Sequence, residues 1–272
     1  MLRTRILTAL VLAPAVLAVV WFAPDWLFRL AAALLLLTGT WEFRRLANLG
    51  PIAGTVLLVL EAALIGLMYY HWDVFHHQAP TVLIVSGVAW CLLALRLVTF
   101  EPGRPSETRY QAISFASAVI VLSASWFALS WLREQPQGEF LILLLLFIIW
   151  AADVGAYFAG QWLGRTRLAP KISPKKTWEG VAGGILLAAL ATLVLSRFTP
   201  LADLSVSRLM ALTVVTVLAS IGGDLFISIH KRTVNLKDAG NLFPGHGGVL
   251  DRFDSLLPGV TFFALAVWTF GS

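Results

Sequence analysis

Long apolar runs separated by short polar segments dominate the chain. A helix needs roughly 20 mostly apolar residues to cross about 30 Å of hydrocarbon. By this measure the pattern predicts about nine transmembrane helices. They cover residues 5–23, 26–43, 52–71, 80–100, 110–132, 138–162, 178–196, 206–228 and 255–271. The sequence therefore predicts an all-α, polytopic integral membrane protein.

The composition supports this class. Hydrophobic residues make up 58% of the chain and charged residues 13%, whereas soluble domains average about 45–50% apolar and about 25% charged residues. No basic, water-soluble domain is visible, so no nucleic acid is expected as a partner. The single cysteine, Cys91, cannot form an intramolecular disulfide.

The basic residues predict the orientation, because Lys and Arg concentrate in cytoplasmic loops. With nine helices and a cytoplasmic N-terminus, the inner segments are the N-terminus and the loops after the second, fourth, sixth and eighth helices. These segments hold most of the 20 Lys and Arg residues. An error of one helix would destroy this bias, so we expect the N-terminus to be cytoplasmic.

The polar motifs lie in the second half of the chain. Residues 1–135 are predicted to be N-terminal transmembrane helices that pack, face lipid and offer contacts for a homodimer. Residues 136–272 are predicted to be a catalytic transmembrane domain with cytoplasmic polar loops. Glu42 and Glu61 fall within apolar runs of the first half, where a buried, partnered carboxyl explains each as well as a cavity-lining one.

A histidine cluster precedes the fourth predicted helix. His71, His76 and His77 lie close to Asp73 in the sequence and offer ligands for a metal. We expect them on the opposite side of the membrane from the polar motifs. A surface loop is the favoured interpretation.

The most polar stretch is residues 228–254, SIHKRTVNLKDAGNLFPGHGGVLDRFD, with Asp224 just before it. Residues three apart share a helix face, so Asp251 and Asp254 point the same way if the ninth helix begins near Asp251. Asp224 is expected at the cytoplasmic end of the eighth helix. Three carboxylates at the membrane boundary predict a Mg²⁺ site that shares its coordination with a phosphate.

The same stretch offers groups that bind phosphate. The run from Pro244 to Gly248 allows close backbone approach to a ligand, and its N–H groups could cradle phosphate oxygens. Basic side chains that could neutralise them are Lys231, Arg232, Lys237 and Arg252. A solvated, positive-inside loop explains the basic residues alone equally well, but it does not explain the carboxylates together with the glycines.

A second polar stretch covers residues 150–184. Asp153 falls within or at the end of the sixth predicted helix, and a charge at membrane depth points to function. The loop that follows predicts a phosphate clamp, which ends where Thr177 could cap the next helix and where the helix N-terminus adds positive charge. The clamp residues are Lys171, Ser173, Lys175 and Lys176. The alternative is a basic loop that binds anionic lipid headgroups without specificity.

At this point the residues resemble a known family. Residues 228–254 are similar to the signature of the phosphatidate cytidylyltransferases (CDP-diacylglycerol synthases), and ISPKKTWEG at Ile172–Gly180 is similar to a second segment of that family. The matching signature residues are Ser228, Lys231, Arg232, Lys237, Asp238, Pro244, His246, Gly247, Gly248, Asp251, Arg252 and Asp254. Ile227 and His230 depart from the pattern. The two segments cover about a fifth of the chain.

The resemblance implies an enzyme that joins CTP and phosphatidic acid to give CDP-diacylglycerol and pyrophosphate. It implies dependence on Mg²⁺, compatible with a second, monovalent cation such as K⁺. It also implies a bacterial-type inner membrane, with surrounding membrane lipids and an active site that faces the cytoplasm.

Residue roles follow from the same resemblance. The expected catalytic residues are Asp224, Asp251, Asp254, Lys231 and Arg232, and the three aspartates are the expected metal ligands. The expected substrate-binding residues are Asp153, Lys171, Ser173, Lys175, Lys176, Ser228, Lys237, Asp238, His246, Gly247, Gly248 and Arg252. Two alternatives stay open. One is a lipid kinase that uses CTP, and the other is a secondary transporter whose ion path runs through Asp153, Asp224 and Glu61.

Overall fold

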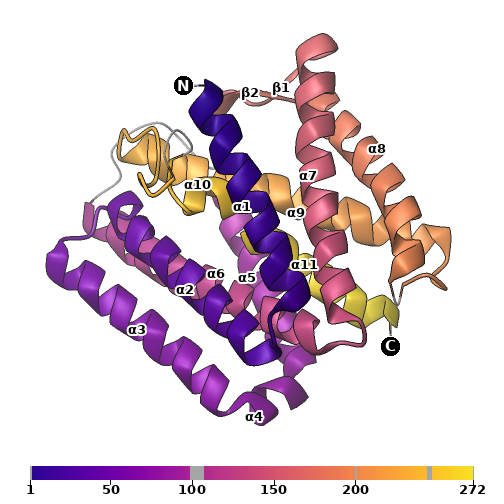
Figure 1. Cartoon of the computed structure of the whole chain (residues 1–272). Coiled ribbons are helices and arrows are strands. Elements are labelled where there is room, and N and C mark those ends of the chain that lie inside the picture. Colours follow the sequence, from indigo (N-terminus) through magenta and orange to yellow (C-terminus); the bar gives the residue numbers. More distant parts are fainter. Residues whose placement is uncertain (1, 99–106, 200, 244–246, 272) are drawn as a thin grey trace.

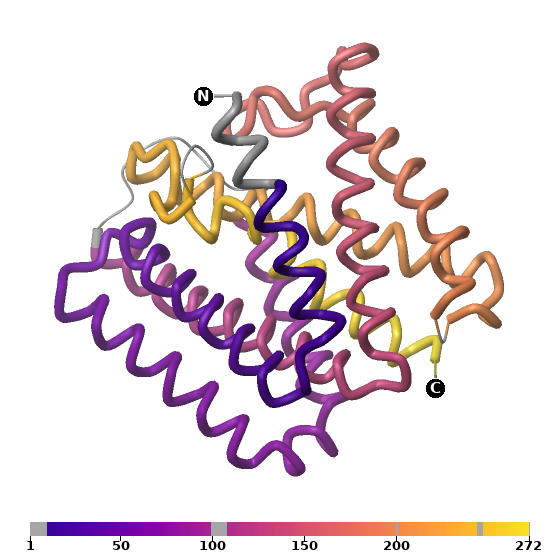
Figure 2. Tube along the Cα trace, viewed as in Figure 1, coloured from indigo at the N-terminus to yellow at the C-terminus, as the bar shows by residue number. Residues whose placement is uncertain are grey.

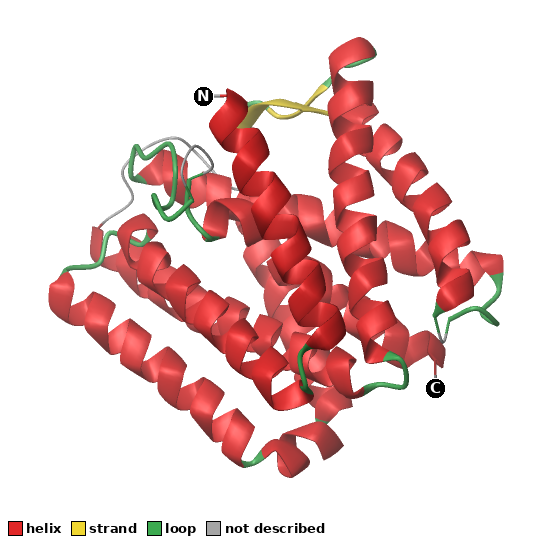
Figure 3. Cartoon of the chain, in the orientation of Figure 1, coloured by secondary structure: helices red, strands yellow, loops and turns green. Residues whose placement is uncertain are grey.

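The computed structural model describes residues 2–98, 107–199, 201–243 and 247–271, and it describes side chains from residue 10 onward, that of residue 107 excepted. Helices make up nearly all of this part of the chain (Figure 3). The helices are α1 (Leu2–Phe22), α2 (Asp25–Leu46), α3 (Pro51–Tyr70), α4 (Trp72–His77), α5 (Ala79–Val98), α6 (Glu107–Glu134), α7 (Gly138–Trp162), α8 (Trp178–Leu195), α9 (Val206–Thr233), α10 (Leu250–Phe253) and α11 (Leu256–Gly271), with a 3₁₀ turn, η1, at Ser196–Phe198. Strands β1 (Arg167–Ala169) and β2 (Ser173–Thr177) form one antiparallel hairpin.

The membrane class predicted from the sequence is confirmed. Within the described residues, eight helical segments are long and apolar enough to cross a membrane. They correspond to the second to ninth predicted spans, with α10 and α11 counted together as Leu250–Gly271. The first predicted span is α1, of which Leu10–Phe22 forms a shorter apolar helix. The chain is therefore an all-α, multi-pass membrane protein.

Two helix boundaries next to the polar stretch 228–254 differ from the prediction. Helix α9 continues to Thr233, so Lys231 and Arg232 are helical rather than part of a loop. The last span begins with the separate turn α10, and α11 starts only at Leu256. Pro258 explains this break, because it has no N–H to bond the carbonyl four residues earlier.

Helices α7 and α8 are the most closely packed pair. A Cβ added to Gly155 would lie 2.4 Å from the Gly183 carbonyl oxygen, and one added to Gly183 would lie 2.3 Å from Ala159 Cβ. Only glycine allows this approach, because small residues let two helix backbones pack closely. The tight pair carries the hairpin that connects α7 to α8 (Figure 1).

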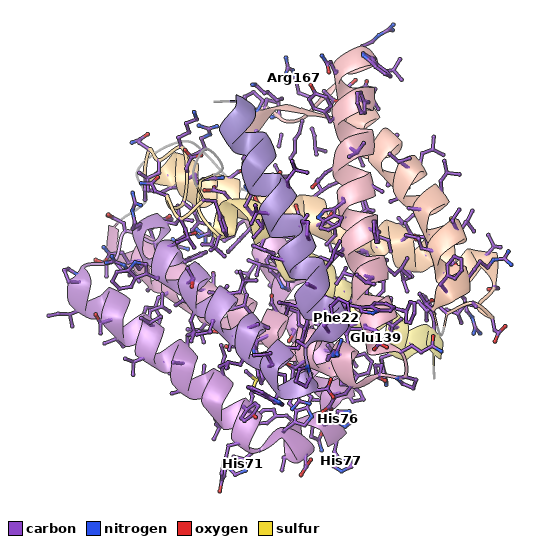
Figure 4. The ribbon with its side chains drawn as sticks, in the orientation of Figure 1. Phe22, His71, His76, His77, Glu139 and Arg167 are labelled. Carbon is purple, nitrogen blue, oxygen red and sulfur yellow. The ribbon has the colours of Figure 1, made fainter. Side chains whose placement is uncertain are left out.

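The two ends of the molecule differ in chemistry. Arg167 of the hairpin lies at the same end as the N-terminus, whereas His71, His76 and His77 lie at the opposite end (Figure 4). His76 pairs with Glu134 at 3.6 Å between Nε2 and Oε2. No group of three or more metal-ligating side chains occurs among the residues described, so the histidine cluster has no support as a metal site.

Helix α1 crosses the face between α2 and α7 (Figure 2). Arg133, from the end of α6, holds the lower end of α1. It donates to the carbonyl oxygen of Ala23 at 2.8 Å and to that of Val20, and its Nε lies 2.9 Å from Asp25 Oδ1. The first helix is thus fixed at the end far from the hairpin.

Candidate active site

A cavity of about 580 Å³ brings the two polar stretches of the sequence together. This volume falls within the range of about 300–1,000 Å³ that is usual for ligand pockets. Its charged lining consists of Asp153 from α7, Asp224 and Lys231 from α9, Asp238 from the loop, and Asp251, Arg252 and Asp254 from the last span. Its apolar lining includes Leu12, Ala13, Val16, Leu146, Ile149 and Trp150.

Asp251 organises the loop between α9 and α10. Its side chain is 4% exposed, and its Oδ1 accepts a bond from Lys231 Nζ at 2.8 Å. Its Oδ2 accepts the N–H of Ala239 at 2.8 Å and the N–H of Gly248 at 2.9 Å. Gly247 turns the chain here with φ +85°, and a Cβ on it would lie 2.6 Å from Asp251 Oδ2. The Asp251 carboxylate therefore connects two points of the loop, Ala239 and Gly248, to Lys231 of α9.

Asp224 connects α9 to the hairpin. Its Oδ2 lies 2.5 Å from Lys176 Nζ on β2, and its Oδ1 accepts the hydroxyl of Ser228, one turn later, at 3.2 Å. Arg232 adds a second tie, because its Nε donates to the Ile172 carbonyl oxygen at 3.3 Å. The hairpin is thereby drawn onto the cytoplasmic end predicted for α9.

Asp254 is a buried carboxylate of the cavity lining. It is 8% exposed, and its Oδ1 accepts the N–H of Ser255 at 2.7 Å. Its charge interacts with that of Asp224, and the charge of Asp153 interacts with Asp224 as well. The carboxylates of Asp153 and Asp254 thus lie near that of Asp224, and Lys176 and Lys231 supply the nearby positive charge.

The three aspartates expected to bind a metal, Asp224, Asp251 and Asp254, all line this cavity. No three His, Cys, Asp or Glu side chains among the described residues are grouped as a metal site, and the three-aspartate site stays a prediction. Both oxygens of Asp251 are engaged by three protein donors. Asp224 and Asp254 remain a fit for Mg²⁺, because this ion usually takes one or two carboxylates and completes its shell with water and substrate phosphates.

The other expected residues are placed as follows. Lys171, Lys175, Lys237 and Asp238 are exposed, and Ser173 is half-buried on β2. The Gly248 N–H donates to Asp251, so it is not open to cradle a phosphate. Pro244, Gly245 and His246 lie outside the described residues.

Glu42, for which the sequence left a buried, partnered carboxyl and a cavity-lining one open, is buried and partnered. This side chain of α2 is 5% exposed, and its two oxygens accept the N–H groups of Val249 at 3.0 Å and Leu250 at 2.9 Å. A Cβ on Gly240 or on Gly248 would lie 2.1 or 2.3 Å from its carboxylate oxygens. A carboxylate inside an apolar run was the available signal, and Glu42 proves to be buried and partnered.

Comparison with known proteins places this geometry in context. The model of the cytidylyltransferase family matches residues 3–270. A phosphatidate cytidylyltransferase of Pseudomonas aeruginosa is 36% identical over 276 residues, which cover 100% of this chain and 98% of the relative. One of Haemophilus influenzae is 35% identical over 285 residues, covering 97% and 98%. One of Rickettsia bellii is 44% identical over 135 residues, covering 47% and 58%.

Proposed function

The chain belongs to the cytidylyltransferase family, and on this premise we propose that it condenses CTP with phosphatidate to give CDP-diacylglycerol and pyrophosphate. The observation that carries the proposal is one cavity lined by carboxylates from both polar stretches, two of which, Asp224 and Asp251, pair with Lys176 and Lys231. Full-length relatives bear the name of this activity. A nucleotide triphosphate and a lipid phosphate both require concentrated positive charge beside a divalent cation, which this cavity could supply.

The lipid substrate is accommodated by an apolar groove that continues from the cavity. The groove has a volume of about 210 Å³ and runs along α1, α2, α6 and α7. It shares with the cavity Leu12, Val16, Leu146, Phe253 and Leu256. We place the phosphate of phosphatidate in the cavity and an acyl chain in this groove, so that the lipid reacts without leaving the membrane.

The reaction is an in-line displacement. A phosphate oxygen of phosphatidate attacks the α-phosphorus of CTP and forms a new P–O bond, while the bond from that phosphorus to the β-phosphate oxygen breaks and releases pyrophosphate. Such transfers depend mainly on positioning and charge neutralisation. No dedicated base is needed, because the attacking phosphate is ionised near neutral pH.

Asp224 and Asp254 would hold Mg²⁺, which supplies positive charge to the nucleotide phosphates when bound. Lys176 and Lys231 are each paired with a carboxylate in this structure. We propose that they turn toward phosphate oxygens when substrate enters, since both ammonium groups border the same region. A monovalent cation and a homodimer stay predictions.

The proposal also includes the side of the membrane to which the cavity opens. CTP is water-soluble, so the cavity must open to the compartment that contains it. The basic residues of the hairpin and of the loop after α9 would face the cytoplasm under the positive-inside rule. We therefore propose a bacterial inner membrane with the cavity on its cytoplasmic side.

The alternatives differ in what they predict for the lining and the products. A transporter is expected to place polar residues in both halves, but the charged lining of the cavity comes from α7, α9 and the segments that follow α9. A CTP-dependent lipid kinase would use the same phosphate-binding groups, so products must separate it from a cytidylyltransferase.

CTP labelled at two different phosphates distinguishes a cytidylyltransferase from a kinase and from a transporter. Purified protein in detergent is given phosphatidate with CTP labelled at the α-phosphate or at the γ-phosphate, with Mg²⁺ or with a chelator. We expect the α-label in the lipid product and the γ-label in pyrophosphate, and no product with the chelator. A γ-label in the lipid would indicate a kinase, and no covalent product would favour a transporter.

A further inference from the structure

We propose that Glu42 is a positioning residue of the active site, acting from the N-terminal half on Asp251 and Asp254. The proposal rests on the proposed function, because it concerns the two carboxylates assigned to that site. By this proposal α2 has a role in catalysis besides packing against other helices and facing lipid.

Glu42 fixes the first turn of the last span. Its oxygens bind two consecutive N–H groups, those of Val249 and Leu250. The Leu250 carbonyl oxygen in turn accepts the N–H of Asp254 at 3.1 Å. The residue held by Glu42 is therefore bonded directly to the backbone of Asp254, and Asp251 lies within the same turn.

The loop is shaped to receive this carboxylate. Gly240 and Gly248 lie against Glu42 so closely that a methyl group on either would collide with an oxygen. Gly248 also donates its N–H to Asp251. One short segment thus contacts Glu42 on one side and Asp251 on the other, so a shift of Glu42 would be transmitted to the cavity.

Misplacing a reacting group by about 1 Å can cost roughly 100-fold in rate. In Glu42→Gln one oxygen becomes an NH₂ group that faces a backbone N–H, so one of the two bonds is lost. We expect kcat to fall about 10- to 100-fold, with little change in KM for CTP because the exposed lysines are untouched. Glu42→Asp keeps the charge and should recover part of the loss.

Glu61→Gln is the matched control. Glu61 is also a carboxyl of the N-terminal half and is 0% exposed, but it accepts a bond from Ser123 of α6 at 3.0 Å instead of the backbone of the last span. We expect its kcat to stay within about two-fold of the unsubstituted protein. Both variants should melt at similar temperatures in detergent, which separates positioning from general stability.

A thiol placed next to the Glu42 contact gives a readout that does not depend on turnover. In a Cys91→Ser background, Val249→Cys places the one thiol of the protein at a side chain that is 3% exposed. We expect a thiol reagent to label it at least about 10-fold faster when Glu42→Gln is added, and at an unchanged rate when Glu61→Gln is added, because local opening governs such access.

A double substitution tests the contact itself. Gly240→Ala alone should lower turnover, because its methyl collides with Glu42. Added to Glu42→Ala, the same methyl enters vacated space and should cost nothing further, a non-additive result typical of groups in contact. Additive losses would count against the proposal.

Failure of this proposal differs from failure of the proposed function. If the unsubstituted protein makes no CDP-lipid, the function is wrong. If it does, and Asp254→Asn abolishes turnover while Glu42→Gln keeps it within two-fold, the positioning role is wrong. The role is also overturned if Glu42→Gln loses turnover and melting temperature together with an unchanged labelling rate.

Discussion

Asp251→Asn removes the charge on α10 that holds the preceding loop, while keeping the size of the side chain. The asparagine can turn its oxygen toward the N–H groups of Ala239 and Gly248, which Asp251 Oδ2 accepts at 2.8 and 2.9 Å. Its NH₂ group then faces the ammonium of Lys231, which lies 2.8 Å from Asp251 Oδ1. Two donors would meet where an ion pair stood.

The free-energy cost follows from these three bonds. The lost bond to a charged partner is worth about 1.5–3 kcal/mol. The other two weaken by roughly half when their acceptor becomes neutral, about 1 kcal/mol each. The total of roughly 3–5 kcal/mol agrees with the cost of breaking a buried ion pair from one side. If the activation free energy rises by this amount, turnover falls by about 10²- to 10³-fold or more.

The assay combines turnover of CTP to CDP-lipid with thermal unfolding in detergent. Asp203→Asn is the matched control, because Asp203 is exposed in the turn before α9. Adding Lys231→Met to Asp251→Asn removes the unpaired ammonium, so the melting temperature should recover in part while turnover does not. Turnover and melting temperature of Asp251→Asn both close to those of the control would refute the reasoning.

Two further predictions concern the elements that carry the site. Gly183→Ala brings a methyl to 2.3 Å from Ala159 Cβ, so overpacking between α7 and α8 should cost about 1–3 kcal/mol and lower the melting temperature. Gly222→Ala, with nothing within 4 Å of the added atom, should leave it unchanged, and equal melting of the two variants would contradict the packing argument. Thr177→Ala removes the cap that accepts the Gly180 N–H at 3.1 Å and should cost about 0.5–2 kcal/mol. Thr177→Ser keeps this acceptor, so a similar loss in both Thr177 variants would show that the hydroxyl does not matter.

The membrane spans could be predicted because they depend on local composition. Each apolar run is long enough by itself to indicate a helix, and the structure follows these runs closely. The two polar stretches could also be recognised one by one, and they meet in one cavity through pairs such as Lys176 with Asp224. Which lysine pairs with which carboxylate was not predictable, because helix packing decides it.

The role of Asp251 shows why spacing alone was insufficient. A separation of three residues predicted a shared helix face with Asp254, and both residues do lie in one turn and line the cavity. The spacing did not reveal that Asp251 also accepts bonds from three donors, two of them in the preceding loop. The partners of Glu42 were not predictable, because they lie 207 and 208 residues away, beyond the reach of any periodic pattern.

That separation has a consequence for synthesis of the chain. A ribosome that adds about 5–20 residues per second needs roughly 10–40 s to proceed from Glu42 to Val249. During this interval α2 is already made, while the backbone groups that will bind its carboxylate do not yet exist. The nascent protein must therefore hold this acidic side chain of α2 without its backbone partners until the start of the last span has been made.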